Sequence, residues 1–140
     1  MSFLQWYVRR GRIGRRTWWL QYFLPLAGLS LLAGVADGAL GYPGLVAEPG
    51  GHGLYAWAGG PLELALIVFF VVPSISGQVT RLHDRGRSAG WLLLNVVPVA
   101  GPVILFGWMG FLRGDGGPNA YGPPEGWTGD RLGDSVDTWA

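Results

Sequence analysis

Apolar residues in this chain are concentrated in three long runs, which polar and glycine-rich segments separate. The runs cover residues 17–36, 61–80 and 91–111, and Glu63 is the only charged side chain within them. A helix of about 20 residues is roughly 30 Å long, which is the hydrocarbon thickness of a bilayer. Soluble core helices usually keep a polar stripe, which these runs lack. The pattern predicts an all-α integral membrane protein with three transmembrane helices rather than a soluble bundle.

Prolines interrupt the runs, at Pro25, Pro73, Pro98 and Pro102. In membrane helices a proline is tolerated as a kink when neighbouring groups satisfy the carbonyl that it leaves free. The third run has two prolines in its centre, so it is compatible with a kinked span or with a re-entrant hairpin. We expect the kinked span and keep the hairpin as the alternative.

The remaining segments are short and irregular. Residues 2–10 predict a short interfacial helix, and residues 37–60 predict a loop that touches the membrane surface through Leu54, Tyr55 and Trp57. The first run is longer than the apolar core of a signal peptide. We therefore expect one membrane domain over residues 1–125 and an irregular polar tail over residues 126–140.

Positive charge is distributed unevenly between the segments that flank the runs. All ten basic residues are arginines, and eight of them form two groups: Arg9, Arg10, Arg12, Arg15 and Arg16, and then Arg81, Arg85 and Arg87. The loop over residues 37–60 contains none, and the tail contains two among several acids. Because short cytoplasmic loops carry excess arginine, three spans would place the N-terminus in the cytoplasm and the C-terminus in the periplasm or exterior. A hairpin in the third run would instead return the tail to the cytoplasm.

Composition excludes several classes of protein. With 49% hydrophobic and 14% charged residues the chain is not intrinsically disordered, and a net charge of +1 argues against a protein that coats nucleic acid. The absence of cysteine excludes a thiol nucleophile and any cysteine-ligated metal. We expect no catalytic residue, no cofactor and no metal site.

Asp84 is the only acid among the eight grouped arginines, which all lie on the predicted cytoplasmic side. We therefore predict that Asp84 pairs with Arg12 or Arg15 in a partly shielded ion pair. The other arginines would face anionic phospholipid headgroups. His83, next to these arginines, is predicted to be a neutral hydrogen-bonding group at the interface.

Three motifs resemble a known family. They are Gly11-Arg12-x-x-Arg15-x-x-Trp18-Trp19; Arg81-Leu-His83-Asp84, which Arg85 and then Arg87-Ser-Ala-Gly-Trp91 follow; and Gly117-Pro-Asn119-Ala-Tyr121-Gly-Pro123. In this order, and over roughly residues 3–125, they are similar to the YhaH/YhaI-like small bacterial inner-membrane proteins, classified as domain of unknown function 805. The resemblance implies a membrane fold and an inner-membrane location, but no reaction. Gly90 departs from the family pattern, because members often carry an aromatic residue there.

The sequence thus predicts a non-catalytic inner-membrane protein, a scaffold or accessory subunit that packs against a larger membrane complex. Its expected partners are the lipid bilayer, anionic headgroups, and either a membrane protein or further copies of itself, but not nucleic acid. The alternative is an oligomeric protein that handles small solutes or anionic lipid through the Arg12, Arg15, Arg81 and Asp84 cluster. A transporter would also need polar groups at mid-membrane, for which Asn95 and Gln78 are candidates.

Overall fold

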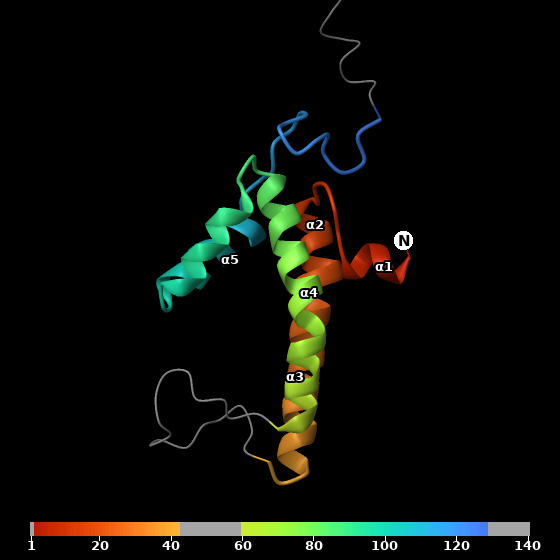
Figure 1. The fold of residues 1–140 in the computed structure, drawn as a ribbon, viewed down its shortest axis with the longest axis vertical. Coiled ribbons are helices and arrows are strands. Elements are labelled where there is room, and N and C mark those ends of the chain that lie inside the picture. Colours follow the sequence, from red (N-terminus) through yellow and green to blue (C-terminus); the bar gives the residue numbers. More distant parts are fainter. Residues whose placement is uncertain (1, 43–59, 129–140) are drawn as a thin grey trace, which may run out of the picture. The chain divides into compact units, whose positions relative to one another are not determined.

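The structure is a computed structural model that describes residues 2–42 and 60–128 (Figure 1). Its elements are α1 (Phe3–Tyr7), α2 (Arg15–Thr17), the π-helix η1 (Trp18–Phe23), α3 (Leu24–Ala39), α4 (Pro61–His83), the 3₁₀-helix η2 (Ala89–Val96) and α5 (Ala100–Gly110). Within the described ranges there is no strand, and one isolated bridge pairs Asn119 with Gly122. The predicted all-helical architecture is confirmed. The surface contacts expected of Leu54, Tyr55 and Trp57, and most of the tail over residues 126–140, lie outside the described residues.

The chain forms two compact units. Unit 1 comprises Met1–Arg10 and Arg16–Gln78, and unit 2 comprises Gly11–Arg15 and Val79–Ala140. Helix α4 begins in unit 1 and ends in unit 2. The division of the sequence means that a short N-terminal stretch, residues 11–15, packs with the C-terminal half of the chain.

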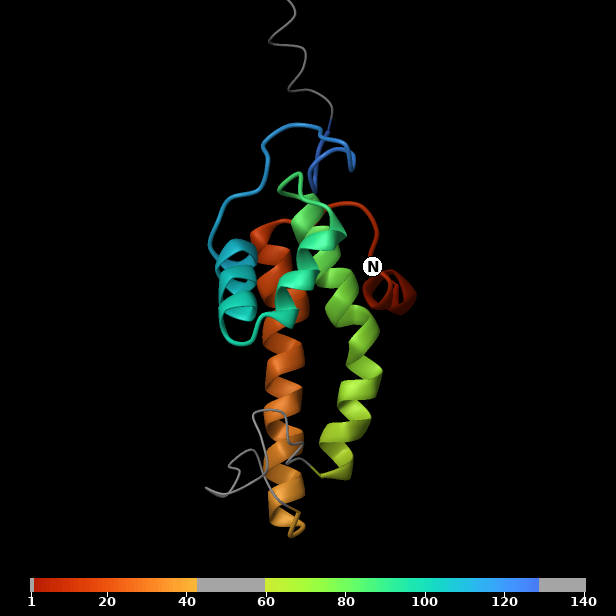
Figure 2. The same ribbon diagram turned by 60° about the vertical axis from the view of Figure 1, so that its left-hand side comes forward.

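Unit 1 is built on two antiparallel helices (Figures 1 and 2). One is the continuous helix Arg15–Ala39, made of α2, η1 and α3, and the other is α4; both are long and apolar enough to cross a membrane. Tyr22 packs on Gly77 near one end of the pair, and Asp37 lies against Gly60 at the other. The Asp37 carboxylate accepts the backbone N–H groups of Leu62 and Glu63, at 3.2 and 2.9 Å, and so caps the N-terminus of α4. These helices match the first two predicted spans.

Side chains of helix α1 donate hydrogen bonds to the two backbone carbonyls that prolines leave without a donor in this pair of helices. Its own start is fixed by a capping box, in which Ser2 and Gln5 exchange hydrogen bonds. Pro25 has no N–H for the carbonyl of Gln21, four residues earlier, and the indole Nε1 of Trp6 donates to that oxygen at 2.7 Å.

The carbonyl that the second proline leaves without a donor is satisfied in the same way. Pro73 has no N–H for the carbonyl of Phe69, and the hydroxyl of Tyr7 donates to that oxygen at 3.1 Å. The hydroxyl of Tyr22 in turn donates to the carbonyl of Trp6 at 3.0 Å, which ties α1 to η1. Both freed carbonyls are therefore satisfied by neutral side chains of one five-residue helix, as hydrocarbon surroundings require.

The third apolar run is a helical hairpin in unit 2 (Figure 2). The ring of Trp91 lies 5.0 Å from that of Trp108, and a Cβ atom at Gly101 would overlap the carbonyl of Leu94, so η2 and α5 run antiparallel. The turn between them is tight: Val99 has φ 64° and ψ −59°, and Ala100 donates to the Pro98 carbonyl at 2.7 Å. This is a γ-turn, which is strained for a β-branched residue.

The hairpin corrects the expectation of a single kinked span over residues 91–111. Helix α5 has 11 residues and is about 16 Å long, half of what a bilayer requires. Pro98 and Pro102 cannot donate backbone hydrogen bonds, so a continuous helix loses two bonds within five residues. The reversal at Val99 ends one helix and starts the next, and the freed carbonyl of Pro98 accepts the N–H of Ala100.

Candidate functional site

The end of α4 carries a buried ion pair in unit 2. The guanidinium of Arg12 donates through Nε and Nη2 to Oδ1 of Asp84, both at 3.2 Å, and Arg81 donates to Oδ2. Side-chain exposure is 0% for both arginines and 6% for Asp84. The predicted pairing of Asp84 with Arg12 is present. Arg81 is a second partner that was not predicted, although its spacing of three residues on a helix end is a favourable one for an ion pair.

Two guanidinium groups and one carboxylate leave one uncompensated positive charge inside the protein. Backbone carbonyls of the C-terminal segment supply the missing acceptors for Arg12: Asp115 at 2.6 Å, Gly117 at 2.7 Å and Gly122 at 3.0 Å. Arg81 likewise donates to the carbonyls of Met109 and Leu112. We call this set, Arg12, Arg81, Asp84 and the carbonyls that they bind, the arginine clamp.

The surroundings of Asp84 are tight as well as buried. Burial raises the pKa of the Asp84 carboxyl above its ordinary value, and the positive charges of Arg81 and Arg12 oppose that shift. A Cβ atom at Gly114 would overlap the Asp84 carboxylate, so the chain can pass here only as glycine. The backbone N–H of Asp115 donates to the carbonyl of Asp84 at 2.7 Å. The C-terminal segment is thus held to the end of α4 by side chains and backbone together.

The third motif closes over His83. The rings of His83 and Tyr121 stack at 3.8 Å and 4°. Asn119 donates from Nδ2 to the His83 carbonyl at 3.0 Å and to Asp115 at 2.9 Å, while its own Oδ1 accepts the Tyr121 N–H at 2.9 Å. Asn119 and Tyr121, which were singled out from the sequence, therefore lie in direct contact with the second motif.

These contacts join segments that were predicted on opposite sides of the membrane. Residues 115–122 were predicted on the far side of the membrane from Arg12 and Asp84, yet they bind both residues. Charge counting could not predict these contacts, because the tail holds few arginines of its own and offers carbonyl oxygens to the arginines of other segments. Every described part of the chain from Val79 to Thr128, with Gly11–Arg15, belongs to this one unit.

The other motif residues lie around the clamp or away from it. Arg15 donates to the Phe111 carbonyl at 2.9 Å instead of pairing with Asp84. Arg85 and Arg87 lie over the rings of Trp108 and Trp91, at 5.6 and 5.0 Å. Arginine and tryptophan thus gather at the open end of the hairpin, a composition typical of a membrane interface.

Trp18 and Trp19 belong to unit 1 and take no part in the clamp. Their rings pack edge to face at 5.3 Å, and both contact Phe23. Sequence reasoning missed Asp115, Gly114 and Trp108, because carbonyl acceptors and close approaches leave no periodic signal. It also missed Trp6 and Tyr7, for which the two proline gaps were the available clue.

The geometry of the clamp indicates a structural role rather than ligand binding. The five N–H donors of Arg12 all point to protein oxygens. A ligand anion would have to displace these bonds and enter a buried site, so the clamp does not favour the alternative of a solute or lipid site at Arg12, Arg15, Arg81 and Asp84. Among the described residues no three histidine or acidic side chains are grouped so that they could hold a metal ion.

Comparisons with known proteins agree with this distribution of motifs. A family model described as a protein of unknown function (DUF805) matches residues 7–123. The chain is 30% identical over 128 residues to the inner membrane protein YhaH of Escherichia coli (strain K12), which covers 86% of this chain and 95% of YhaH. It is also 31% identical over 102 residues to the uncharacterized protein YiiR of the same strain, covering 69% of this chain and 56% of YiiR. No solved structure matches.

Proposed function

We propose that this chain, which belongs to the DUF805 family of proteins of unknown function, is a non-catalytic inner-membrane protein that serves as an accessory subunit. The relative YhaH is named an inner membrane protein, and two helices here have the length and composition of membrane spans. The proposal has two parts, a topology and a surface for a partner. Each part has its own support.

The topology is two spans followed by a re-entrant hairpin, with both termini in the cytoplasm. Helix α4 ends in the arginine clamp, and residues 115–122 bind the same clamp, so the segment between them leaves and returns on one side. The arginine-rich segments at residues 9–16 and 81–87 favour the cytoplasm for that side. Arg85, Arg87, Trp91 and Trp108 would then lie at the interface, and the aliphatic turn would enter the bilayer.

The partner surface is the apolar turn of the hairpin, and this observation carries the proposal. Val96 and Val99 are 77% and 69% exposed in the chain alone. Backbone that is not α-helical is not tolerated against lipid, where its polar groups find no acceptors, and must be covered by protein or water. At about 16 Å from the interface the turn would reach the bilayer centre. We assign its cover to a membrane-spanning segment of a larger complex.

Asn95 supplies a polar group for that contact. It lies on η2 just before the turn, and it is exposed among apolar neighbours. An asparagine at this depth can hydrogen-bond to an adjacent helix, for which model systems give about 1–2 kcal/mol. Such a bond would give a partner both affinity and orientation.

The test is native mass spectrometry of the protein, gently solubilised from its own membrane. We expect stable complexes with another membrane protein in the wild type, a fall in their fraction of about fivefold in Asn95→Leu, and no change in Gln21→Leu, which replaces an exposed polar residue of unit 1. The fold-change corresponds to the loss of about 1 kcal/mol. Monomers or homo-oligomers alone, or equal partner fractions in both variants, would contradict the accessory role.

A further inference from the structure

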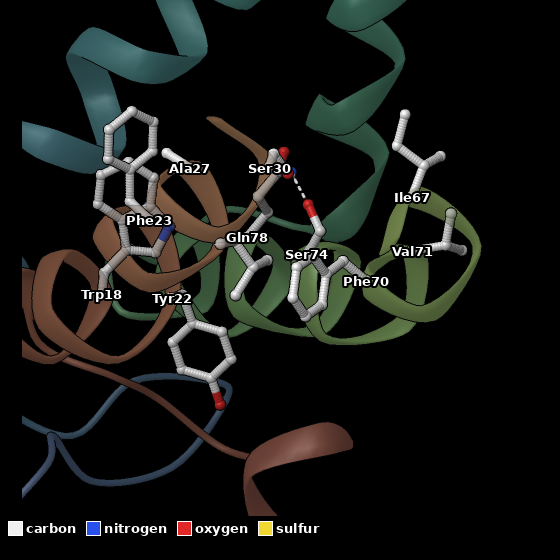
Figure 3. Close-up of a pocket in the computed structure, with 11 residues that line it drawn as sticks. Trp18, Tyr22, Phe23, Ala27, Ser30, Ile67, Phe70, Val71, Ser74 and Gln78 are labelled. Atoms are coloured by element: carbon white, nitrogen blue, oxygen red, sulfur yellow. Dashed lines mark hydrogen bonds between the residues drawn. The ribbon is translucent and has the colours of Figure 1, made fainter. Parts of the chain in front are cut away.

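A groove of about 340 Å³ lies between η1, α3 and α4 within unit 1 (Figure 3). One wall comes from residues between Trp18 and Ser30, and the other from residues between Ile67 and Gln78. Its volume falls at the lower end of the range for ligand pockets, roughly 300–1,000 Å³. Ala27, Ile67 and Val71 line it and are exposed, so the groove opens on the outer surface of two membrane-spanning helices.

The π-helix shapes one wall of this groove. In η1 the N–H of Leu24 donates to the carbonyl of Trp19, five residues earlier, which widens the turn. The same widening lets Trp18 stack on Phe23, with ring centroids 5.3 Å apart. Single π-helical turns are rare and are frequently found at functional sites. Opposite Tyr22, the helices approach because Gly77 has no side chain: a Cβ there would lie 2.6 Å from the ring.

The groove has Ser74 and Gln78 toward one end, and apart from Ser30 the rest of its lining is apolar or aromatic. Since Tyr22 packs on Gly77, the antiparallel register places Trp18 and Gln78 together at the polar end, and Ile67 is farther along. The amide nitrogen of Gln78 donates to the hydroxyl of Ser74 at 3.1 Å (Figure 3), which leaves one N–H and the carbonyl oxygen for another molecule. Arg16 is exposed two residues before Trp18 and adds a positive charge at this end.

We infer that the groove binds one acyl chain of an anionic phospholipid, with the ester region at Gln78 and the phosphate near Arg16. A groove that opens on the surface of membrane-spanning helices is in contact with lipid chains, and its apolar walls match them. An α-helix of a second copy, about 10 Å across, is too wide for a groove of this volume. The cytoplasmic leaflet of a membrane carries the anionic lipids that Arg16 would attract.

This inference rests on two parts of the proposed function, namely that the helices of unit 1 cross the bilayer and that the end at Arg16 faces the cytoplasm. It concerns lipid adducts rather than protein partners, so either can fail while the other stands. Ala27 and Ala65 form a matched pair for the test, because both are exposed helical alanines and only Ala27 lines the groove. Phenylalanine at position 27 would fill the groove from its open side without replacing a core residue.

The experiment is native mass spectrometry of the purified full chain with equimolar phosphatidylglycerol and phosphatidylcholine in mixed micelles. We expect one retained phosphatidylglycerol per wild-type chain, a fall in the bound fraction of about tenfold in Ala27→Phe, and no change in Ala65→Phe. Arg16→Gln, an exposed change, should reduce the preference for phosphatidylglycerol over phosphatidylcholine about fivefold.

Several outcomes would overturn the inference. Equal lipid binding by Ala27→Phe and Ala65→Phe would place the lipid elsewhere on the protein. An unchanged headgroup preference in Arg16→Gln would remove the assigned phosphate position. A wild-type chain that sheds every lipid, or that forms lipid-free dimers which Ala27→Phe disrupts, would assign the groove to a protein contact.

Discussion

In unit 1 the side chains that satisfy the carbonyls freed by proline are neutral, whereas in unit 2 the side chains that bind the carbonyls of residues 109–122 are guanidinium groups. Trp6 and Tyr7 donate to the carbonyls that Pro25 and Pro73 leave free in two helices that are long and apolar enough to cross a membrane. Arg12 donates to carbonyls of the irregular segment that follows α5, and Arg81 donates to the carbonyls of Met109, at the end of α5, and of Leu112, just after it. In both units the donor to the carbonyl comes from a residue far away in the sequence.

The difference follows from what each unit must satisfy. A helix interrupted by proline lacks a single N–H, and one indole or hydroxyl replaces it without bringing charge into hydrocarbon. An irregular segment presents several carbonyls at once, and one guanidinium with five donors binds more of them than any neutral side chain. The arginine in turn needs a counter-charge, which Asp84 provides. Charged donors are therefore expected where the chain leaves the membrane, and neutral donors within it.

Removal of the counter-charge should have the largest effect. Asp84→Asn leaves two buried guanidinium groups without a carboxylate, and we expect it to lower the free energy of unfolding by about 3 kcal/mol. Arg87→Gln, on an exposed residue that lies over Trp91, should cost about 0.5–1 kcal/mol. Thermal unfolding in one detergent measures both, and equal small shifts in melting temperature would show that the ion pair does not stabilise the fold.

The hairpin of unit 2 can be tested within one helix. Gly101→Ala places a methyl group against the backbone carbonyl of Leu94, whereas nothing lies within 4 Å of a Cβ at Gly107. We expect a loss of about 2 kcal/mol for Gly101→Ala and no loss for Gly107→Ala, in which a helical glycine becomes alanine. In a kinked single span the two changes would be equivalent, so equal melting temperatures would contradict the hairpin.

The neutral donors of unit 1 should give a smaller effect that depends on proline. Trp6→Phe removes the N–H that satisfies the Gln21 carbonyl, and we expect it to cost about 1–2 kcal/mol. Pro25→Ala restores a backbone N–H there, so Trp6→Phe should cost less in that background. A double-mutant cycle on melting measures the coupling, and the same cost in both backgrounds would show that the bond is unimportant.

The stacking of His83 on Tyr121 should contribute least. Tyr121→Leu removes the ring and is expected to cost about 1 kcal/mol, while Tyr121→Phe keeps the stack and should be neutral. The same unfolding measurement applies. A loss in Tyr121→Phe as large as that in Tyr121→Leu would point to the hydroxyl rather than the ring.

Patterns with local causes were predictable from the sequence. The first two runs and α1 followed from length and periodicity. Charge predicted that Asp84 pairs with Arg12 or Arg15, and the structure shows Arg12 as the partner. The structure of the third run could not be predicted in this way, because a kinked span and a hairpin have the same composition over residues 91–111. The close contact of Gly101 with Leu94 distinguishes the hairpin from the kinked span. The hydropathy of a segment does not show which of its residues approach one another closely.

The function of individual side chains was harder to predict than the elements that carry them. The carbonyls that Pro25 and Pro73 leave free require donors, but nothing in the sequence assigns Trp6 to one carbonyl and Tyr7 to the other. The arginines other than the partner of Asp84 were expected to face lipid headgroups, but Arg81 instead binds Asp84 and the carbonyls of Met109 and Leu112. Arg12 pairs with Asp84 and also binds backbone carbonyls. Backbone acceptors are identical in every residue, so a sequence cannot show which of them an arginine will bind.

We propose that the arginine clamp holds the C-terminal segment on the side of the membrane where α4 ends. The most direct test is a pair of fusions at the C-terminus, one to a reporter that is active only in the cytoplasm and one to a reporter that is active only in the periplasm. We predict full cytoplasmic signal and a silent periplasmic fusion. Periplasmic activity with a silent cytoplasmic fusion would contradict the claim, because a tail across the membrane cannot bind Arg12.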